Sequence, residues 1–100
     1  VGSEMCIRDR SGIEYKVKKT EGPLVVGGVQ VYGSINYDDR EISIDTKVQD
    51  DQGVKATFIH EVLHGIVFDR EIDFKNDDEE KIIEQMSKGL YSILKSNKFA

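Results

Sequence analysis

An apolar stretch near the middle of the chain, residues 56–68, limits the folds that this sequence can adopt. Its hydrophobic side chains, together with Val54, recur at spacings that cover nearly the whole circumference of a helix. A helix that is apolar all round is buried on several sides, which places it at the centre of a domain. Asp50 or Asp51 can cap its start, so we expect a central helix from there to about Phe68.

This helix carries both histidines of the chain, in the motif His60-Glu61-Val62-Leu63-His64. Residues four apart lie on one face of a helix, so the two imidazoles can bind a single metal ion. Glu61 projects about 100° away from the first histidine. It therefore lies beside the metal, where it can polarise a metal-bound water as a general base. The motif predicts a hydrolytic site with one Zn²⁺ per chain and Glu61 as its catalytic residue.

Two ordinary core histidines on a buried helix are the simplest alternative explanation of this motif. For a lone histidine that explanation would be preferred. Here the two histidines have the one spacing that converges on a metal ion, and an acidic residue lies between them. The pair therefore favours a metal site.

A catalytic zinc ion usually has three protein ligands and one water. With no third histidine and no nearby cysteine, we expect the third ligand to be a glutamate of the following helix. Glu79 falls in the middle of the apolar stripe of that helix, but it is also suited to capping. Glu80 lies at the edge of the stripe, whereas Glu84 lies on the far side, between two lysines. Glu84 follows His64 by twenty residues, a spacing similar to that of thermolysin-like enzymes. Glu80 is our first choice for the third ligand and Glu84 the second.

The second helix is expected to begin at residue 76 or 77 and to run to about Ser96. Asn76-x-x-Glu79 and Asp77-x-x-Glu80 are overlapping capping boxes at its start. Its apolar residues form a single stripe, which we expect to belong to the core: Ile82, Ile83, Met86, Leu90, Ile93 and Leu94.

Three short strands are expected before the helices. The first shows apolar and charged residues in alternation over residues 13–18. The second, residues 29–35, contains Gly33 as a bulge or a close contact. The third, residues 41–45, turns its two isoleucines inward. This order predicts an α+β fold, in which a small three-stranded antiparallel sheet is followed by two packed helices, with the histidine-bearing helix central.

Length and composition predict one domain, residues 11–97, with a frayed tail at residues 98–100. Residues 1–10 read VGSEMCIRDR, and the last six letters look like a translated sequencing adapter, so we expect this segment to be non-native. The net charge of −5 argues against direct binding of nucleic acid, and no apolar run is long enough to cross a membrane. The single cysteine, Cys6, cannot form an internal disulfide, which favours a cytoplasmic protein.

The order of these elements resembles that of the compact gluzincins of the ImmA/IrrE type, especially their small phage and mobile-element members, the minigluzincins. The resemblance extends over residues 12–97. It is carried by the segments I-E-Y-K-V, V-Y-G-S-I-N-Y, R-E-I-S-I-D and A-T-F-I-H-E-V-L-H-G-I. Relatives of this type have a glutamate that begins an E-x-x-A-N-like element on the following helix. In that register Glu80 takes the place of the glutamate, and Glu84 replaces the asparagine.

This resemblance implies a minimal zincin-like zinc metallopeptidase. Relatives of this type cut repressors or regulators encoded beside them. The implied partner is therefore a protein or peptide substrate, with a phage or host DNA-binding repressor as the natural candidate. Tyr37 and Tyr91 are candidate donors to the developing oxyanion. The strand at residues 40–45 is a candidate for binding substrate if it forms the edge of the sheet.

Two other functions stay open at the level of sequence. The domain can be a non-catalytic, zinc-stabilised protein-binding domain of a phage or mobile element. A fourth protein ligand, from Asp69, from Asp73 or from Glu80 and Glu84 together, would indicate such a closed site. The domain can also be an α+β interaction domain without a metal. Metal content separates this last function from the other two.

Overall fold

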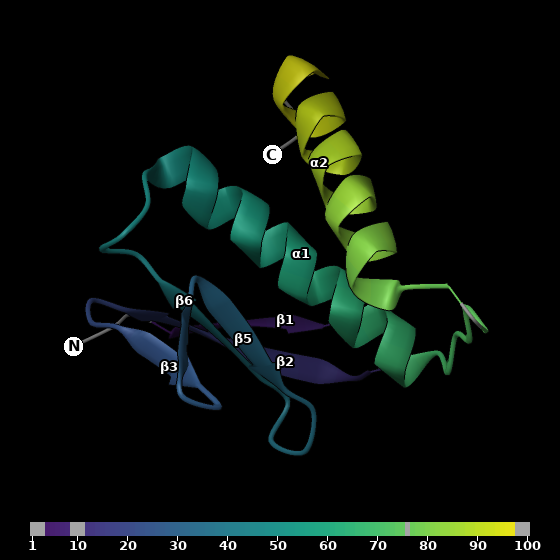
Figure 1. Cartoon of the computed structure of the whole chain (residues 1–100), viewed down its shortest axis with the longest axis horizontal. Helices are drawn as coiled ribbons and strands as arrows, with labels where there is room; N and C mark the ends of the chain where they lie inside the picture. Colours follow the sequence, from purple (N-terminus) through teal and green to yellow (C-terminus); the bar gives the residue numbers. More distant parts are fainter. Residues whose placement is uncertain (1–3, 9–11, 76, 98–100) are drawn as a thin grey trace.

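The computed structural model describes residues 4–8, 12–75 and 77–97, which form six strands and two helices (Figure 1). The strands are β1 (Glu4–Arg8), β2 (Glu14–Thr20), β3 (Leu24–Val26), β4 (Val29–Val31), β5 (Gly33–Asn36) and β6 (Glu41–Asp45). The helices are α1 (Asp51–Asp69) and α2 (Glu79–Asn97). The predicted α+β class with two packed helices is confirmed.

Four strands form a mixed sheet in the order β1-β2-β6-β5. β1 is antiparallel to β2, β2 is parallel to β6, and β6 is antiparallel to β5. The expected three-stranded antiparallel sheet is therefore wrong in the number of strands and in their directions. The cause is the path of the chain after β2. It leaves this sheet, forms the separate β3–β4 hairpin and returns as β5 at the far edge, so that β6 pairs between β2 and β5.

The segment expected as one strand over residues 29–35 is divided between two sheets. β4 turns back onto β3 at Gly27 and Gly28, whose φ angles of 58° and 79° suit a two-residue hairpin turn. β5 begins after Tyr32, whose carbonyl oxygen accepts a hydrogen bond of 2.9 Å from the amide of Asp45. Because β5 lies at the edge and β6 lies inside the sheet, the condition under which residues 40–45 were a candidate for binding substrate is not met.

β1 lies within the segment that we expected to be adapter-derived. It pairs with β2 along its whole length, from Glu4 opposite Lys18 to Arg8 opposite Glu14, and Ile7 packs against the core. Regular structure therefore begins before residue 11. This pairing does not bear on the origin of the segment, and the adapter origin stays a hypothesis. Residues 1–3 and 9–10 of that segment, and the expected frayed tail at 98–100, lie outside the described residues.

The core lies between one face of the sheet and α1. The buried residues alternate along β2 and β6, as side chains on one face of a strand do, and the inward direction of the β6 isoleucines is confirmed. Partly buried residues of α1 pack against them. The core residues are Tyr15, Val17, Ile42 and Ile44 from the sheet and Val54, Phe58 and Val62 from α1.

α1 begins where its capping residue was expected. The side chain of Asp50 accepts a hydrogen bond of 2.8 Å from the amide of Gly53, and the helix then runs to Asp69. It lies between the sheet and α2, as expected for a central helix (Figure 1). Ile66 and Phe68 are nevertheless about half exposed, because neither the sheet nor α2 covers that part of its circumference.

α2 begins later than expected, at Glu79. The residue that caps it is Asp78 rather than Asp77, because the side chain of Asp78 accepts a hydrogen bond of 3.3 Å from the amide of Lys81. The other predicted cap, Asn76, lies outside the described residues. The expectation that the whole apolar stripe of α2 belongs to the core is wrong. Ile83 is fully buried, but Met86, Leu90 and Ile93 are 52%, 40% and 58% exposed. The reason is that α2 crosses α1 near its own start and then extends away from the body of the domain (Figure 1).

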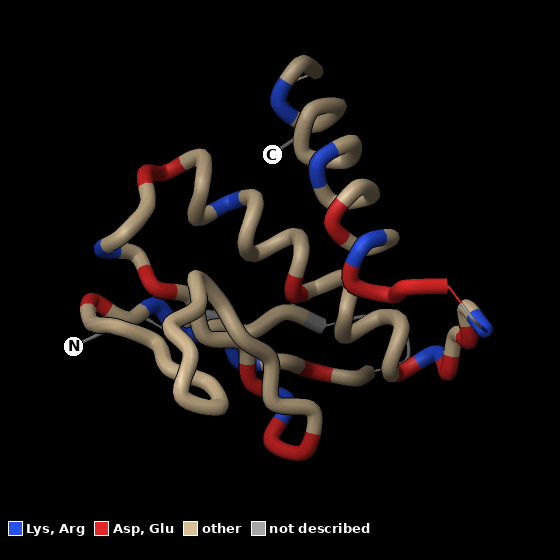
Figure 2. Tube along the Cα trace, in the orientation of Figure 1, with Lys and Arg blue, Asp and Glu red and all other residues tan. Residues whose placement is uncertain are grey.

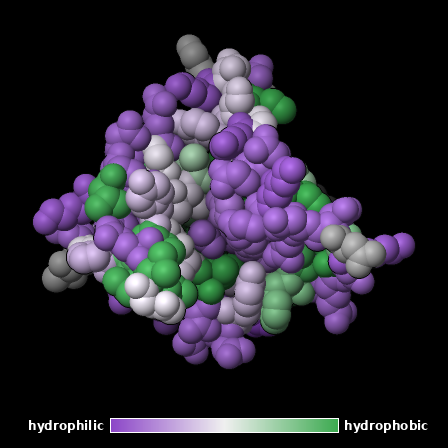
Figure 3. Space-filling model, in the orientation of Figure 1, coloured by the Kyte–Doolittle hydropathy of each residue, from purple (hydrophilic) through white to green (hydrophobic). Residues whose placement is uncertain are grey.

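Charge and hydrophobicity are unevenly distributed over the surface. Acidic residues gather at the start of α2 (Figure 2). In the view of Figure 3, hydrophobic side chains gather over the β3–β4 hairpin, where Val25, Val26 and Val29 are exposed. Neither helix of the described chain combines the length and the apolar character needed to span a bilayer.

The ionisation of Tyr15 tests the packing between the sheet and α1. Burial, and after it the neighbouring Asp69 carboxylate, raise the pKa of Tyr15 from 10.0 to about 12. The folded protein thus keeps this proton to a higher pH than the unfolded chain does. The resulting stabilisation is complete below pH 10 and is lost as the pH rises through about 12. We expect ultraviolet titration of the folded protein to show a tyrosine step near pH 12 that Tyr15→Phe removes. A Tyr15 step at the ordinary pKa would contradict this packing.

Candidate metal centre

The candidate site lies where α1 crosses the start of α2. α1 carries both histidines and Glu61, and α2 carries Glu79 and Glu80 in its first turn and Glu84 one turn later. Because α1 packs against the sheet and α2 against α1, the side chains of His60 and His64 are only 14% and 11% exposed, whereas the three glutamates of α2 are 43% to 67% exposed. The structure therefore brings the two histidines, Glu61 and the candidate glutamates of α2 into one place.

His60, His64 and Glu80 form a group of three potential metal ligands. Their ligand atoms all lie within 4.8 Å of one another. The two Nε2 atoms are 3.2 Å apart, and the Glu80 carboxylate spans them. Its Oε1 lies 2.8 Å from Nε2 of His60, and its Oε2 lies 2.9 Å from Nε2 of His64. Two imidazole nitrogens and two carboxylate oxygens thus face one point.

The spacing of these atoms fits a small divalent cation. Ligand atoms at about 2.0–2.1 Å from a tetrahedral metal ion lie about 3.3 Å from one another. The distance between the two Nε2 atoms, 3.2 Å, is close to that value. Imidazole nitrogen and carboxylate oxygen are also the donor types that zinc and related first-row metals accept. This group can hold a metal ion.

Glu79 contacts the second histidine from the other side of its ring. Nδ1–H of His64 donates to Oε2 of Glu79 at 2.8 Å, which leaves the lone pair on Nε2 for the point that it shares with His60 and Glu80. Sequence reasoning missed this contact, because the capping pattern suggested a role at the helix end. The sequence did hold one sign of this contact with His64, because Glu79 falls in the middle of the apolar stripe of α2.

Glu84 has a similar but looser position beside the first histidine. Its Oε2 lies 3.5 Å from Nδ1 of His60, and its Oε1 lies 3.7 Å from Nζ of Lys88. It therefore contacts the ring atom that points away from the group of three. Of the two glutamates considered as the third ligand, Glu80 lies close to both Nε2 atoms, whereas Glu84 does not belong to the group.

Glu61 of α1 is buried where the helix faces β5, and it is close enough to His60, His64 and Glu80 for their charges to act on its carboxyl. Burial raises the pKa of its carboxyl, and the imidazoles of His60 and His64 oppose this by favouring the charged form. A carboxyl whose pKa is raised exchanges its proton closer to neutral pH, which suits a group that accepts and returns a proton.

Gly33 allows the edge strand β5 to approach α1 closely. A Cβ at this position would overlap Cγ2 of Thr57 and would lie 3.4 Å from Oε2 of Glu61. The close contact predicted for this glycine is confirmed, and it places the edge of the sheet directly beside the buried carboxyl of Glu61.

Tyr37 is the better placed of the two tyrosines that were considered as donors. Burial first, and then the carboxylates of the site with that of Glu79 foremost, raise its pKa, so its hydroxyl lies in their field. Its ring stacks on Phe68, with centroids 4.2 Å apart. Both rings and Glu79 line a cavity of about 410 Å³ beside the site. Tyr91 follows Glu80 by eleven residues, or about 16 Å along the helix axis, and does not reach the group.

Comparison with known proteins returned no match to a family model, to a curated protein or to a solved structure.

Substitution of the three glutamates tests this arrangement. We expect Glu80→Gln to weaken zinc affinity at least tenfold because it removes a ligand, and Glu79→Gln to weaken it by about 10 to 100-fold because His64 loses its carboxylate partner. Glu84→Gln should have the smallest effect of the three, since its contact with His60 is longest. Competition titration with a chelating dye measures all three, with the exposed Glu21→Gln as the matched control. Loss of metal in Glu84→Gln but not in Glu80→Gln would contradict the assignment.

Proposed function

We propose that this domain is a zinc-dependent endopeptidase of the zincin type, a minimal gluzincin that cleaves a phage or host regulatory protein in the cytoplasm. One observation carries the proposal: His60, His64 and Glu80 converge on a single point beside the buried carboxyl of Glu61. Zinc bound there would supply a water molecule of lowered pKa and would polarise the carbonyl of the scissile bond.

Glu61 moves the proton in this reaction. Its carboxylate takes a proton from the attacking water as the new C–O bond forms, and it gives that proton to the nitrogen that leaves as the C–N bond breaks. The burial of Glu61 near His60 and His64 supports this role, because the carboxyl is shielded from bulk water and lies next to the proposed ligands. Its position at the edge strand supports it as well, since substrate can approach from that side.

Tyr37 is the proposed donor to the oxyanion that develops on the substrate. A tyrosine hydroxyl is protonated at neutral pH, and the carboxylates of the site raise the pKa of Tyr37 further, so its hydroxyl can donate a hydrogen bond. The stacked contact with Phe68 holds the Tyr37 ring in one orientation, which lowers the entropy cost of positioning its hydroxyl toward the substrate.

The edge strand supports a polypeptide as the substrate. Along an antiparallel pair of strands, hydrogen-bonded residue pairs alternate with pairs that are not hydrogen-bonded. The amide of Asp45 donates to the carbonyl of Tyr32, so the next residues in the alternation that do not bond to β6 are Gly33 and Ile35. Their backbone N–H and C=O groups point away from β6. An extended peptide can pair with these groups and would then pass beside Glu61.

The number of ligands supports an enzyme over a structural zinc site. Asp69 and Asp73, the other acids weighed as a fourth ligand, have other neighbours. Asp69 faces Tyr15, and the side chain of Asp73 accepts from the amide of Lys75 at 2.7 Å. Among the described residues the group has three members, which leaves a position for water or substrate.

A non-catalytic, zinc-stabilised protein-binding domain is the second candidate. The observation in its favour is the exposed apolar stripe of α2, formed by Met86, Leu90 and Ile93, which offers a surface for a partner protein. In that case the same three ligands would hold zinc to join α1 to α2, and Glu61 would have no chemical role.

Glu61→Gln separates these two candidates. The amide has nearly the shape of the carboxyl but cannot accept the proton, so we expect zinc content to stay at one per chain and peptide cleavage to fall by at least about 100-fold. Elemental analysis gives the metal content, and a library of quenched fluorescent peptides gives the cleavage rate, with Glu21→Gln as the control. Undiminished cleavage by Glu61→Gln would sink the proposed mechanism, and a folded wild-type domain without metal would sink the zinc site.

A further inference from the structure

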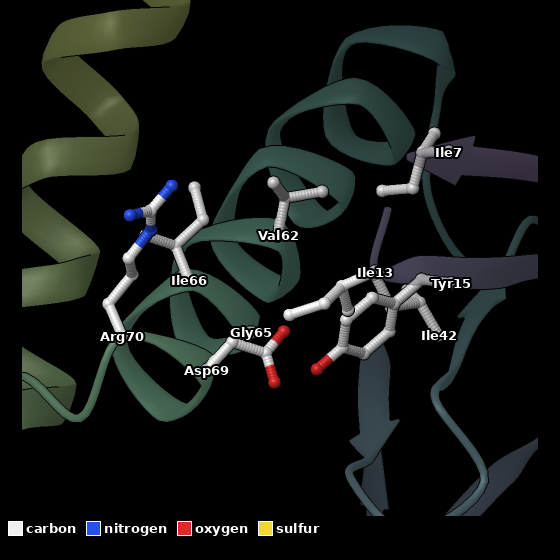
Figure 4. Close-up of a pocket in the computed structure, with 9 residues that line it drawn as sticks. All are labelled: Ile7, Ile13, Tyr15, Ile42, Val62, Gly65, Ile66, Asp69 and Arg70. Atoms are coloured by element: carbon white, nitrogen blue, oxygen red, sulfur yellow. The ribbon is translucent and has the colours of Figure 1, made fainter. Parts of the chain in front are cut away.

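An apolar pocket of about 260 Å³ lies between α1 and the sheet (Figure 4). Val62 and Ile66 of its wall are each two residues from His64, or about 200° around the helix. The pocket therefore opens on the side of α1 that faces away from the metal group. Its apolar wall is formed by Ile7, Ile13, Ile42, Val62 and Ile66.

The inner end of the pocket is polar. The hydroxyl of Tyr15 is buried there and faces the Asp69 carboxylate, but no hydrogen bond of good geometry satisfies it in the part of the chain that the structure describes. Figure 4 shows this hydroxyl pointing toward the carboxylate of Asp69. A buried hydroxyl without a partner is unfavourable, so a ligand that offers it a hydrogen bond gains affinity.

Gly65 keeps this end of the pocket open. A Cβ at this position would lie 3.4 Å from Cζ and 3.5 Å from the hydroxyl oxygen of Tyr15. A larger side chain would therefore fill the space in front of the phenol. With glycine here, the hydroxyl and the Asp69 carboxylate can face the same molecule.

We propose that this pocket binds a small apolar molecule that carries a protonated amine. The carboxylate of Asp69 can only accept hydrogen bonds, and the Tyr15 hydroxyl can accept as well, so both suit an ammonium group. The apolar wall suits a hydrocarbon body, and cavities of about 150 Å³ already hold a benzene ring. Arg70, which would suit a carboxylate instead, turns its guanidinium to the other side of Ile66 (Figure 4).

The polar end and most of the wall are independent of the first ten residues. Only Ile7 comes from that segment, whereas Tyr15, Ile42, Val62 and Asp69 belong to β2, β6 and α1. The site also shares no residue with the metal group, so its ligand binding is measurable whether or not the domain cleaves peptides.

The test uses 2-phenylethylamine with the full chain, and 2-phenylethanol and 3-phenylpropionate as matched neutral and acidic probes. We expect calorimetry to show saturable binding of the amine, weaker binding of the alcohol and the weakest binding of the acid. Nuclear magnetic resonance shifts should cluster at Tyr15, Val62 and Gly65. Asp69→Asn should weaken the amine about tenfold or more, because it removes the charge that the ammonium faces. Asp73→Asn, on the exposed connection to α2, should leave its affinity unchanged.

Tyr15→Phe gives a second, independent measurement. It removes only a buried hydroxyl that faces Asp69 without a well-formed hydrogen bond, so the domain should keep its fold, and its amine affinity should fall severalfold. Tighter binding of 3-phenylpropionate than of the amine would overturn the proposal and indicate Arg70 as the recognition residue. The absence of saturable amine binding, shifts confined to the metal group, or full affinity in both Asp69→Asn and Tyr15→Phe would also overturn it.

Discussion

The position of the Glu80 carboxylate between two imidazoles is the interaction on which the site and the placement of α2 both depend. α2 touches the rest of the domain mainly near its start, through fully buried Ile83 and through the carboxylates that face His60 and His64. Largely buried imidazoles need polar partners, and acceptor atoms that face one point need a proton or a metal ion between them. A metal ion would meet both needs, and its binding energy would then also stabilise the packing of α2 on α1.

Local periodicity is the reason that much of the site could be predicted from the sequence. The 100° step of a helix relates His60, Glu61 and His64 to one another without reference to the rest of the chain, and the same step placed Glu80 at the edge of the α2 stripe. Capping by Asp50 and the inward isoleucines of β6 are local features of the same kind. The capping pattern at the start of α2 was misleading, because it drew attention away from Glu79 as a partner of His64.

The parts that the sequence did not reveal depend on contacts between distant segments. Strand order follows the path of the whole chain, so the parallel pairing of β2 with β6 and the break at Tyr32 left no local pattern. Periodicity also shows which side of a helix is apolar but not what covers it. Met86 and its apolar neighbours on α2 were for that reason expected in the core, although the helix carries them beyond α1. The pocket at Tyr15 likewise exists only because β2, β6 and α1 meet there.

The central claim is that one metal ion sits among His60, His64 and Glu80 with a coordination position left open. Anomalous diffraction at the zinc edge, from crystals of the zinc-loaded protein, tests it most directly. We expect a single peak per chain at about 2.0–2.1 Å from both Nε2 atoms and from a carboxylate oxygen of Glu80, with no fourth protein ligand. A peak elsewhere, or one coordinated by Glu84 or another side chain in the fourth position, would contradict it.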